Sequence, residues 1–265
     1  MSITIIYLAK HHLARISLIV ILIGITLTVF HTSLKSVSEG MLTTVVAGAK
    51  LHPIYAVDTK EKVVAFSFDA AWGNSRTPKI LQILADHEIK TTFFLTNIWL
   101  KQYPDLAKQI VSEGHETALH SDTHPNMTGL TDQKILAELT ENAKLVTEIT
   151  GQKPLLFRPP FGAYNNKVLT ITRDAGFIPI QWSVDSLDWK NLSADSIYQR
   201  VTTKVHPGAI VLFHNDGANT PQALEPIIEY LKKEGYRIVP ISEIIYKDFY
   251  YIDNNGIQKL KKETM

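Results

Sequence analysis

Residues 63–96 read VVAFSFDAAWGNSRTPKILQILADHEIKTTFFLT, and this stretch decides the fold class. Apolar runs at 63–68 and 91–96 flank a segment, 77–87, whose apolar residues recur at spacings of three and four. A strand, a helix and a second strand in this order are typical of a parallel β–α–β unit. The stretch therefore predicts an α/β fold.

The same alternation continues along the chain. Further apolar runs occur at 116–120, 155–160, 180–184, 209–214 and 237–241, and helix-like segments separate them. Seven strands over about 185 residues fall short of an eight-unit barrel, which typically takes ~250 residues. We predict a distorted (β/α)7-type barrel over residues 61–247, with an open doubly wound sheet as the alternative.

Residues 1–31 differ from the rest of the chain. Lys10 and Arg15 precede an uncharged apolar run at 16–30, ISLIVILIGITLTVF. Its length lies between a signal-peptide core and a full membrane span, and no good cleavage site follows it. We predict a cytoplasmic stub and a single-pass anchor helix, with the α/β domain outside the cell membrane. Cleavage of the segment and secretion is the alternative. Residues 32–60 are expected to be a linker, and residues 248–265 a solvated C-terminal tail.

Composition excludes several classes of protein. Lysine plus arginine is 27 and aspartate plus glutamate is 26, so the formal net charge is +1. This balance gives no support for nucleic-acid binding, which usually shows a basic excess. The chain contains no cysteine, which excludes thiol catalysis, disulfides and thiolate metal sites.

Ionisable residues stand at the ends of five predicted strands: Asp69, His120, Arg158, Asp185 and His214. In barrel folds the chemistry gathers at the carboxyl ends of the strands. Five such residues meeting at one rim indicate a single site.

Two local motifs support this hypothesis. His120 and His124 form an HxxxH pair in HSDTH (120–124), and two neutral imidazoles suit zinc. In RPPFG (158–162) two prolines stiffen the backbone and the glycine frees the next turn. This loop either serves as a brace or holds Arg158 in place, with the Phe161 amide available as a hydrogen-bond donor.

Five motifs together resemble a known family. The segments FDAA (68–71), HSDTH (120–124), RPPFG (158–162), DSLDW (185–189) and LFH (212–214) occur in the order and spacing of the polysaccharide deacetylases. This is the NodB-homology domain of carbohydrate esterase family 4, and the resemblance covers residues 62–246. Within it, the chain looks most like the sporulation (PdaB-like) branch. The resemblance implies a distorted (β/α) barrel and metal-dependent removal of acetyl groups from chitin, peptidoglycan or xylan.

The resemblance also implies a role for four ionisable residues. Asp69 is similar to the family's general base, and Arg158 to the residue that pairs with it. His214 is similar to the general acid, and Asp188 to the carboxylate that tunes this histidine. A base and an acid must hold opposite protonation states at one pH, so each needs its own partner.

The remaining motif residues resemble the binding groups of the family. His120 and His124 correspond to metal ligands, with zinc expected first and cobalt, nickel or manganese as alternatives. The Phe161 backbone amide corresponds to the donor that stabilises the oxyanion. Trp189 and Leu212 correspond to the residues that line the pocket for the acetyl methyl group.

One position departs from the family pattern. The family commonly has two adjacent aspartates, a base and then a metal ligand, whereas this chain has Ala70 at the second position. A methyl group cannot bind a metal, and a catalytic zinc usually has three protein ligands. Water, Asp122 or Asn74 could take the third place.

These observations lead to two hypotheses. The first is a metal-dependent N-deacetylase that acts on the amino sugars of peptidoglycan, in sporulation and at the membrane, with no role for nucleic acid. The second is a catalytically impaired glycan-binding or spore-assembly protein, which Ala70 favours. A metal phosphodiesterase is a weaker third reading, because the chain shows neither a second set of carboxylate ligands nor a phosphate-binding glycine loop.

Overall fold

The computed structural model describes residues 50–261. The predicted anchor at 1–31 and most of the predicted linker lie outside the described residues. Within residues 50–261, no helix combines the length and the apolar character that crossing a bilayer requires. One compact unit begins at Leu51, and all of the architecture below belongs to it.

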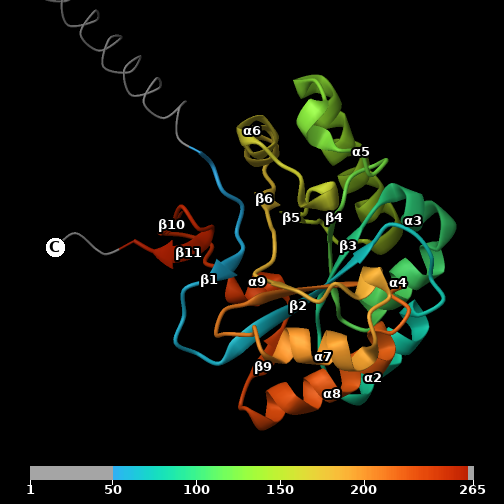
Figure 1. The fold of residues 1–265 in the computed structure, drawn as a ribbon. Helices are drawn as coiled ribbons and strands as arrows, with labels where there is room; N and C mark the ends of the chain where they lie inside the picture. The colour runs from blue at the N-terminus through green and yellow to red at the C-terminus, as the bar shows by residue number, and fades with distance from the viewer. Residues whose placement is uncertain (1–49, 262–265) are drawn as a thin grey trace, which may run out of the picture. The chain divides into compact units, whose positions relative to one another are not determined.

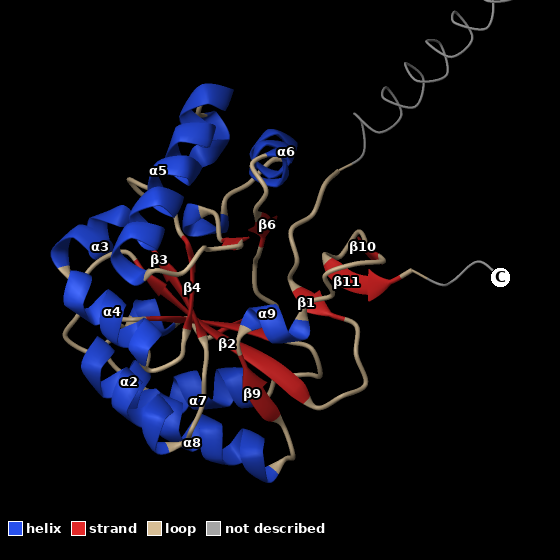
Figure 2. Ribbon diagram, turned by 180° about the vertical axis from the view of Figure 1, so that it is seen from behind, coloured by secondary structure: helices blue, strands red, loops and turns tan. Residues whose placement is uncertain are grey.

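A parallel sheet forms the centre of this unit (Figures 1 and 2). Its strands follow the order β6 (Ile178–Pro179), β5 (Leu156–Phe157), β4 (Glu116–Leu119), β3 (Thr92–Leu95), β2 (Val63–Ala70), β8 (Ile210–His214) and β7 (Val184–Asp185), and β9 (Arg237–Val239) also pairs with β2. Every strand pair in it is parallel. Because β6 and β7 form the two ends of the order, the sheet is a curled, incompletely closed barrel.

Eight α-helices connect these strands within the described residues: α2 (Thr77–Asp86), α3 (Asn97–Gln102), α4 (Pro104–Ser112), α5 (Asp132–Thr150), α6 (Asn166–Asp174), α7 (Ala194–Thr202), α8 (Thr220–Lys233) and α9 (Ile241–Ile244). Short 3-10 helices lie at Met127–Gly129, Pro160–Gly162 and Asp188–Lys190. Local sequence explains several ends. The Thr131 side chain caps the start of α5, and Gly151 ends it with a left-handed backbone.

Both faces of the sheet are buried, and side chains alternate between them. On β2, Val64, Phe66 and Phe68 belong to an apolar cluster that includes residues from each of the helices α2–α8. Val63 and Ala65 belong to a second cluster on the other face, which α9 and the segment around Ile54 complete. Helices α2–α8 thus share one cluster on the outer face of the sheet. This arrangement confirms the barrel-type prediction and excludes the doubly wound alternative.

The predicted strand at 180–184 is wrong. The structure has β6 just before this segment and β7 at its end, with an irregular connection between them. Instead of joining a ladder, Gln181 donates its backbone N–H to the carbonyl of Ile54 at 2.7 Å, and Ser183 donates to Ile210 at 3.1 Å. The segment thus divides its hydrogen bonds between Ile54 near the N-terminal end of the described chain and Ile210 at the start of β8.

The predicted domain limits at 61 and 247 also need correction. Strands β1 (Ala56–Val57), β10 (Tyr250–Ile252) and β11 (Ile257–Leu260) form a separate three-stranded sheet in the order β1–β11–β10. Ile54, Val57 and Ile252 pack against the second apolar cluster. Residues 51–60 and 248–261 are therefore part of the folded unit and not a linker and a solvated tail.

Candidate active site

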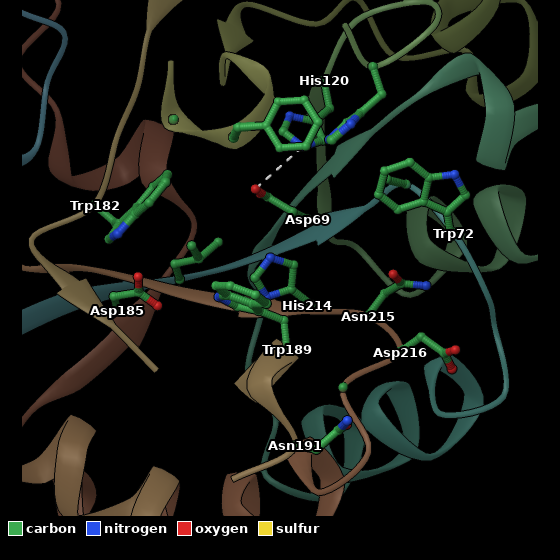
Figure 3. Close-up of a pocket in the computed structure, with 16 residues that line it drawn as sticks. Asp69, Trp72, His120, Trp182, Asp185, Trp189, Asn191, His214, Asn215 and Asp216 are labelled. Atoms are coloured by element: carbon green, nitrogen blue, oxygen red, sulfur yellow. Dashed lines mark ion pairs between the residues drawn. The ribbon is translucent and has the colours of Figure 1, made fainter. Parts of the chain in front are cut away.

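A cleft of about 600 Å³ opens at the carboxyl ends of the strands (Figure 3). Seven of the nine predicted site residues line it: Asp69, His120, His124, Phe161, Trp189, Leu212 and His214. The other two, Arg158 and Asp188, are fully buried and contact the residues that line it. The structure thus brings all nine residues together.

Asp69, at the end of β2, is held by a buried ion pair. Its Oδ1 accepts a hydrogen bond from Arg158 Nη1 at 2.6 Å. Burial alone would raise the pKa of Asp69, but the charge of Arg158, the neighbouring His120 and His214 and the hydrogen bond from Arg158 together outweigh burial and keep the pKa below its usual value. Asp69 is therefore ionised at neutral pH, as a base must be.

Arg158 is fixed on several sides although it is fully buried. Its Nη2 donates to Ser67 Oγ at 2.9 Å and to the Gln181 carbonyl at 3.2 Å. Its guanidinium also lies over the Phe94 ring, 4.0 Å from the centroid. These contacts leave Arg158 little freedom to turn away from Asp69. Sequence reasoning missed Ser67, which lies 91 residues from Arg158 along the chain.

His214, at the end of β8, forms the second ion pair. Its Nδ1 lies 2.7 Å from Asp188 Oδ1, while Asp188 Oδ2 accepts from the His214 backbone N–H at 2.8 Å and from Thr220 Oγ1 at 2.6 Å. Burial would lower the pKa of His214, but the hydrogen bond and charge of Asp188 outweigh burial and raise the pKa. His214 therefore holds a proton more firmly than a free imidazole. Thr220 is a second supporting residue that the sequence motifs did not reveal.

His120 and His124 offer a pair of neutral imidazoles. His120 Nδ1 lies 2.8 Å from the Arg158 carbonyl, which can only accept, so this nitrogen carries the proton. The unprotonated Nε2 then lies 3.5 Å from Asp69 Oδ2. The two histidine rings are 4.9 Å apart, and burial lowers the pKa of His120 and lowers that of His124 to about 4. A neutral imidazole oriented by a backbone carbonyl is the form that binds metals.

His120 and His124 supply two of the three protein ligands that a catalytic zinc usually takes. Within residues 50–261, no group of three or more histidine, aspartate and glutamate side chains is arranged to hold a metal. Ala70 is fully buried in the cluster on the helix side of the sheet. Asp122 accepts a hydrogen bond from Asn97 Nδ2 at 2.7 Å and lines a different cavity. Asn74 is not among the residues that line the cleft.

Backbone strain gathers around the cleft. Seven non-glycine residues in the described part of the chain have positive φ, and five of them lie in its loops: Ser121, His124, Phe161, Leu187 and Asn191. A left-handed backbone costs a non-glycine residue about 1–3 kcal/mol. At Phe161 (φ 61°) this turn holds a ring that is 66% exposed at the cleft.

The sequence profile of the polysaccharide deacetylases matches residues 56–180. The chain is also 35% identical, over 202 residues, to the peptidoglycan-N-acetylmuramic acid deacetylase PdaA of Bacillus subtilis, and the match covers 75% of this chain and 77% of PdaA. The chain belongs to the polysaccharide deacetylase family. A second relative, YlxY of Bacillus subtilis, is 35% identical to this chain over 194 residues, which span 73% of this chain and 60% of YlxY.

Among solved structures, the chain is similar to BA3943 of Bacillus anthracis, which is described as a pseudoenzyme of carbohydrate esterase family 4 (CE4). The identity is 40%, the TM-score is 0.70, and the match covers 72% of this chain and 68% of BA3943. A BA3943 mutant described as having restored enzymatic activity matches with 41% identity, a TM-score of 0.70 and coverage of 72% and 70%. The polysaccharide deacetylase fold therefore includes both active members and a member that lacks activity.

Proposed function

We propose that this chain removes acetyl groups from the N-acetylated amino sugars of peptidoglycan. One observation carries the proposal. The register of the β2–β8 ladder pairs Asp69 directly with His214. Arg158 keeps the first residue ionised, while Asp188 keeps the second protonated. Neighbouring strands thus present a base and an acid in the protonation states that amide hydrolysis requires.

The protein groups act in sequence on one acetamide. As a water oxygen adds to the acetyl carbon, Asp69 accepts the proton that the water loses. The Phe161 amide donates to the carbonyl oxygen as it becomes negative, a contribution of about 2.7–4 kcal/mol. His214 then donates its Nε2 proton to the sugar nitrogen as the carbon–nitrogen bond breaks, and acetate and a free amine leave. Trp189 and Leu212 line the wall beside this position.

A divalent metal, zinc first, would be held by His120 and His124. When bound, it would polarise the acetyl carbonyl and lower the pKa of a bound water. With two protein ligands instead of three, its affinity is expected to be low, so that activity depends on the concentration of free metal.

We further propose a cellular location and a biological process for this activity. PdaA acts on peptidoglycan according to its name, and we carry that substrate class to this chain. The apolar run at 16–30, with positive charge before it, supports a membrane anchor and a deacetylase domain outside the cell. The resemblance of the motifs to the sporulation branch supports a role in that process.

A second candidate function is glycan binding without turnover. Ala70 leaves the metal site one ligand short, and the similar BA3943 is described as a pseudoenzyme. In this reading the cleft still binds glycan, but no acetate is released.

Acetate release from purified peptidoglycan and from N-acetylglucosamine oligomers separates the two functions. The full chain is stripped of metal and then titrated with zinc, cobalt, nickel or manganese. A deacetylase releases acetate in a metal-dependent way, and Asp69→Asn and His214→Ala each abolish the release. His206→Ala serves as the matched control, because this histidine does not line the cleft. Glycan binding without release at any metal concentration would instead establish the second function.

A further inference from the structure

An aromatic side chain that the mechanism does not use stands at the cleft. Trp72 is 59% exposed and lies two residues after the end of β2. Eight large apolar side chains are exposed in the described part of the chain, and three of them, Trp72, Phe161 and Trp189, line this one cleft. Such a concentration of exposed aromatic surface marks a place where a ligand is bound.

The backbone that carries Trp72 is fixed, although its ring is exposed. The carbonyl of Gly73 accepts hydrogen bonds from Trp99 Nε1 at 2.7 Å and from Asn215 Nδ2 at 2.9 Å. Gly73 has a φ of 66°, and a Cβ there would lie 2.0 Å from Asp216 Oδ2, so the loop and Asp216 are packed closely together. The backbone that carries the ring is thus in place before any ligand arrives, which lowers the entropy cost of binding.

Asp216 fixes the same loop from a second side. Its Oδ1 accepts hydrogen bonds from the Arg76 backbone N–H at 3.1 Å and from Ser75 Oγ at 3.0 Å. Asp216 lies two residues after His214, so the loop that bears Trp72 is tied to the segment that bears the proposed acid. The indole therefore has a defined place relative to the reacting group.

The chemistry of the cleft favours a hydroxyl-rich ligand. No lysine or arginine is among its lining residues in the described structure, whereas Asp69, Asp185 and Asp216 are. Carboxylates accept hydrogen bonds from hydroxyl groups, and the electron-rich face of an indole attracts the weakly positive C–H face of a pyranose ring. An aromatic plane beside carboxylates is thus suited to the uncharged face of a sugar ring.

Figure 3 shows Trp72 and Trp182 on opposite sides of Asp69. Both indoles line the same cleft as Asp69 and could therefore contact a sugar whose acetamide reaches Asp69. Trp182 also has a structural role. Its ring packs so closely against Gly162 that a Cβ there would lie 2.7 Å from the ring, and its face lies near Arg158. Trp72 is the better of the two for a test by substitution, since its exposed ring does not pack in the core.

We propose that Trp72 is a stacking platform for the pyranose next to the one that reacts, so that the site selects an oligosaccharide over a single amino sugar. The identity of this oligosaccharide as an N-acetylhexosamine chain rests on the proposed function. The platform itself rests on the exposure and position of the ring and on the fixed backbone of its loop.

A structural role for Trp72 makes a different prediction. Its ring contacts the edge of the His124 ring, with centroids 4.6 Å apart, and Phe161 makes a similar contact at 4.6 Å. If Trp72 only braced His124, its removal would weaken zinc binding and lower kcat for every substrate alike. A platform instead affects affinity, and only for ligands long enough to reach it.

Calorimetry on the full chain tests the platform without requiring turnover. The ligands are the N-acetylglucosamine monomer, its β-1,4-linked tetramer and a peptide-free peptidoglycan tetrasaccharide, each with a chelator present so that no metal-dependent reaction proceeds. We expect Trp72→Ala to weaken tetramer binding about tenfold, to leave monomer binding unchanged, and Trp72→Phe to restore most of the affinity. Phe249→Ala is the matched control, since Phe249 is 83% exposed and does not line the cleft.

The outcomes are separable from those of the deacetylase assay. A selective loss of tetrasaccharide affinity without any acetate release would support the platform and refute the deacetylase. Where acetate is released, the platform requires a higher KM for the tetramer at unchanged kcat. Unchanged affinity of Trp72→Ala for both tetrasaccharides would overturn the platform. An equal loss for monomer and tetramer, or a wild-type chain that binds neither tetrasaccharide, would also overturn it.

Discussion

The Asp188–His214 pair gives the sharpest test of the proposed chemistry, through the substitution Asp188→Asn. Asp188 is fully buried, and its carboxylate accepts three hydrogen bonds, two from His214 and one from Thr220. An asparagine has nearly the same shape but no charge, and its amide group must face at least one donor. We expect the lost hydrogen bond to reduce the free energy of unfolding by about 1–3 kcal/mol.

The larger effect of Asp188→Asn is on the protonation of His214. In the wild type the carboxylate outweighs burial, and the pKa of His214 is raised. Without that charge, burial dominates and the pKa moves down. An acid must be protonated to act, so activity falls as pH rises through this pKa, and the variant loses activity at a lower pH. At neutral pH the deacetylation rate is expected to fall about 100-fold or more, the usual contribution of a positioned acid.

The direct assay is an NMR titration of the His214 ring in wild type and variant between about pH 5 and 8. It reports the pKa whether or not the chain turns over substrate. Asp216→Asn is the control, because it removes a carboxylate from the same cleft while Asp216 pairs with Arg76 and not with His214. An unchanged titration of His214 in Asp188→Asn would refute the claim that Asp188 sets its protonation state.

Three further predictions test other parts of the structure. Arg158→Met leaves Asp69 buried without its partner, so the free energy of unfolding should fall by about 3–5 kcal/mol in urea titrations, and a fall no larger than for Lys153→Met would contradict the pairing argument. His115 is buried, its pKa is lowered to about 4, and the unfolded chain binds the proton more tightly, so acidification from pH 6.5 towards pH 4 should cost about 3 kcal/mol of stability through this group alone. His120 and His124, whose pKa values are also lowered, add to the total loss, so urea unfolding of His115→Gln should show a loss about 3 kcal/mol smaller than that of the wild type; an equal loss in both proteins would contradict the prediction. Ala70→Asp should raise zinc affinity about tenfold or more by calorimetry and increase acetate release if position 70 is the missing ligand, whereas destabilisation with unchanged affinity would mean that the side chain stays in the helix-side cluster.

The sequence was sufficient for the parts of the fold that depend on long apolar runs. The strands at 63–70, 92–95, 116–119 and 210–214 coincide with such runs, because a strand buried on both faces is mostly apolar. The motif residues could be predicted to meet because parallel strands place their carboxyl ends on one rim. Their roles as base, acid and ligands remain predictions until the variants are measured.

Other features left no readable signal in the sequence. Strands β10 and β11 have only three and four residues. They pair with each other, and β11 also pairs with β1, about 200 residues earlier in the chain. Ser67 and Thr220 support the two ion pairs through single hydrogen bonds across 91 and 32 residues. Neither periodicity nor turn chemistry encodes contacts of this kind, which exist only once the strands are in register.

The energetics of the two ion pairs bear on which function the cleft performs. A fully buried pair such as Asp69–Arg158 contributes little net stability, because desolvation offsets most of the attraction, and apolar residues of similar size would serve the core as well or better. The carboxylate of Asp188, which is buried behind His214, also contributes little net stability. Five strained loop residues and an exposed Trp72 add further cost to the same region. Binding a neutral glycan would need the aromatic wall but neither buried pair, whereas hydrolysis of an acetamide needs a base and an acid in opposite protonation states. The retention of both pairs around a metal site with one ligand missing therefore favours a deacetylase limited by metal affinity over a protein that only binds glycan.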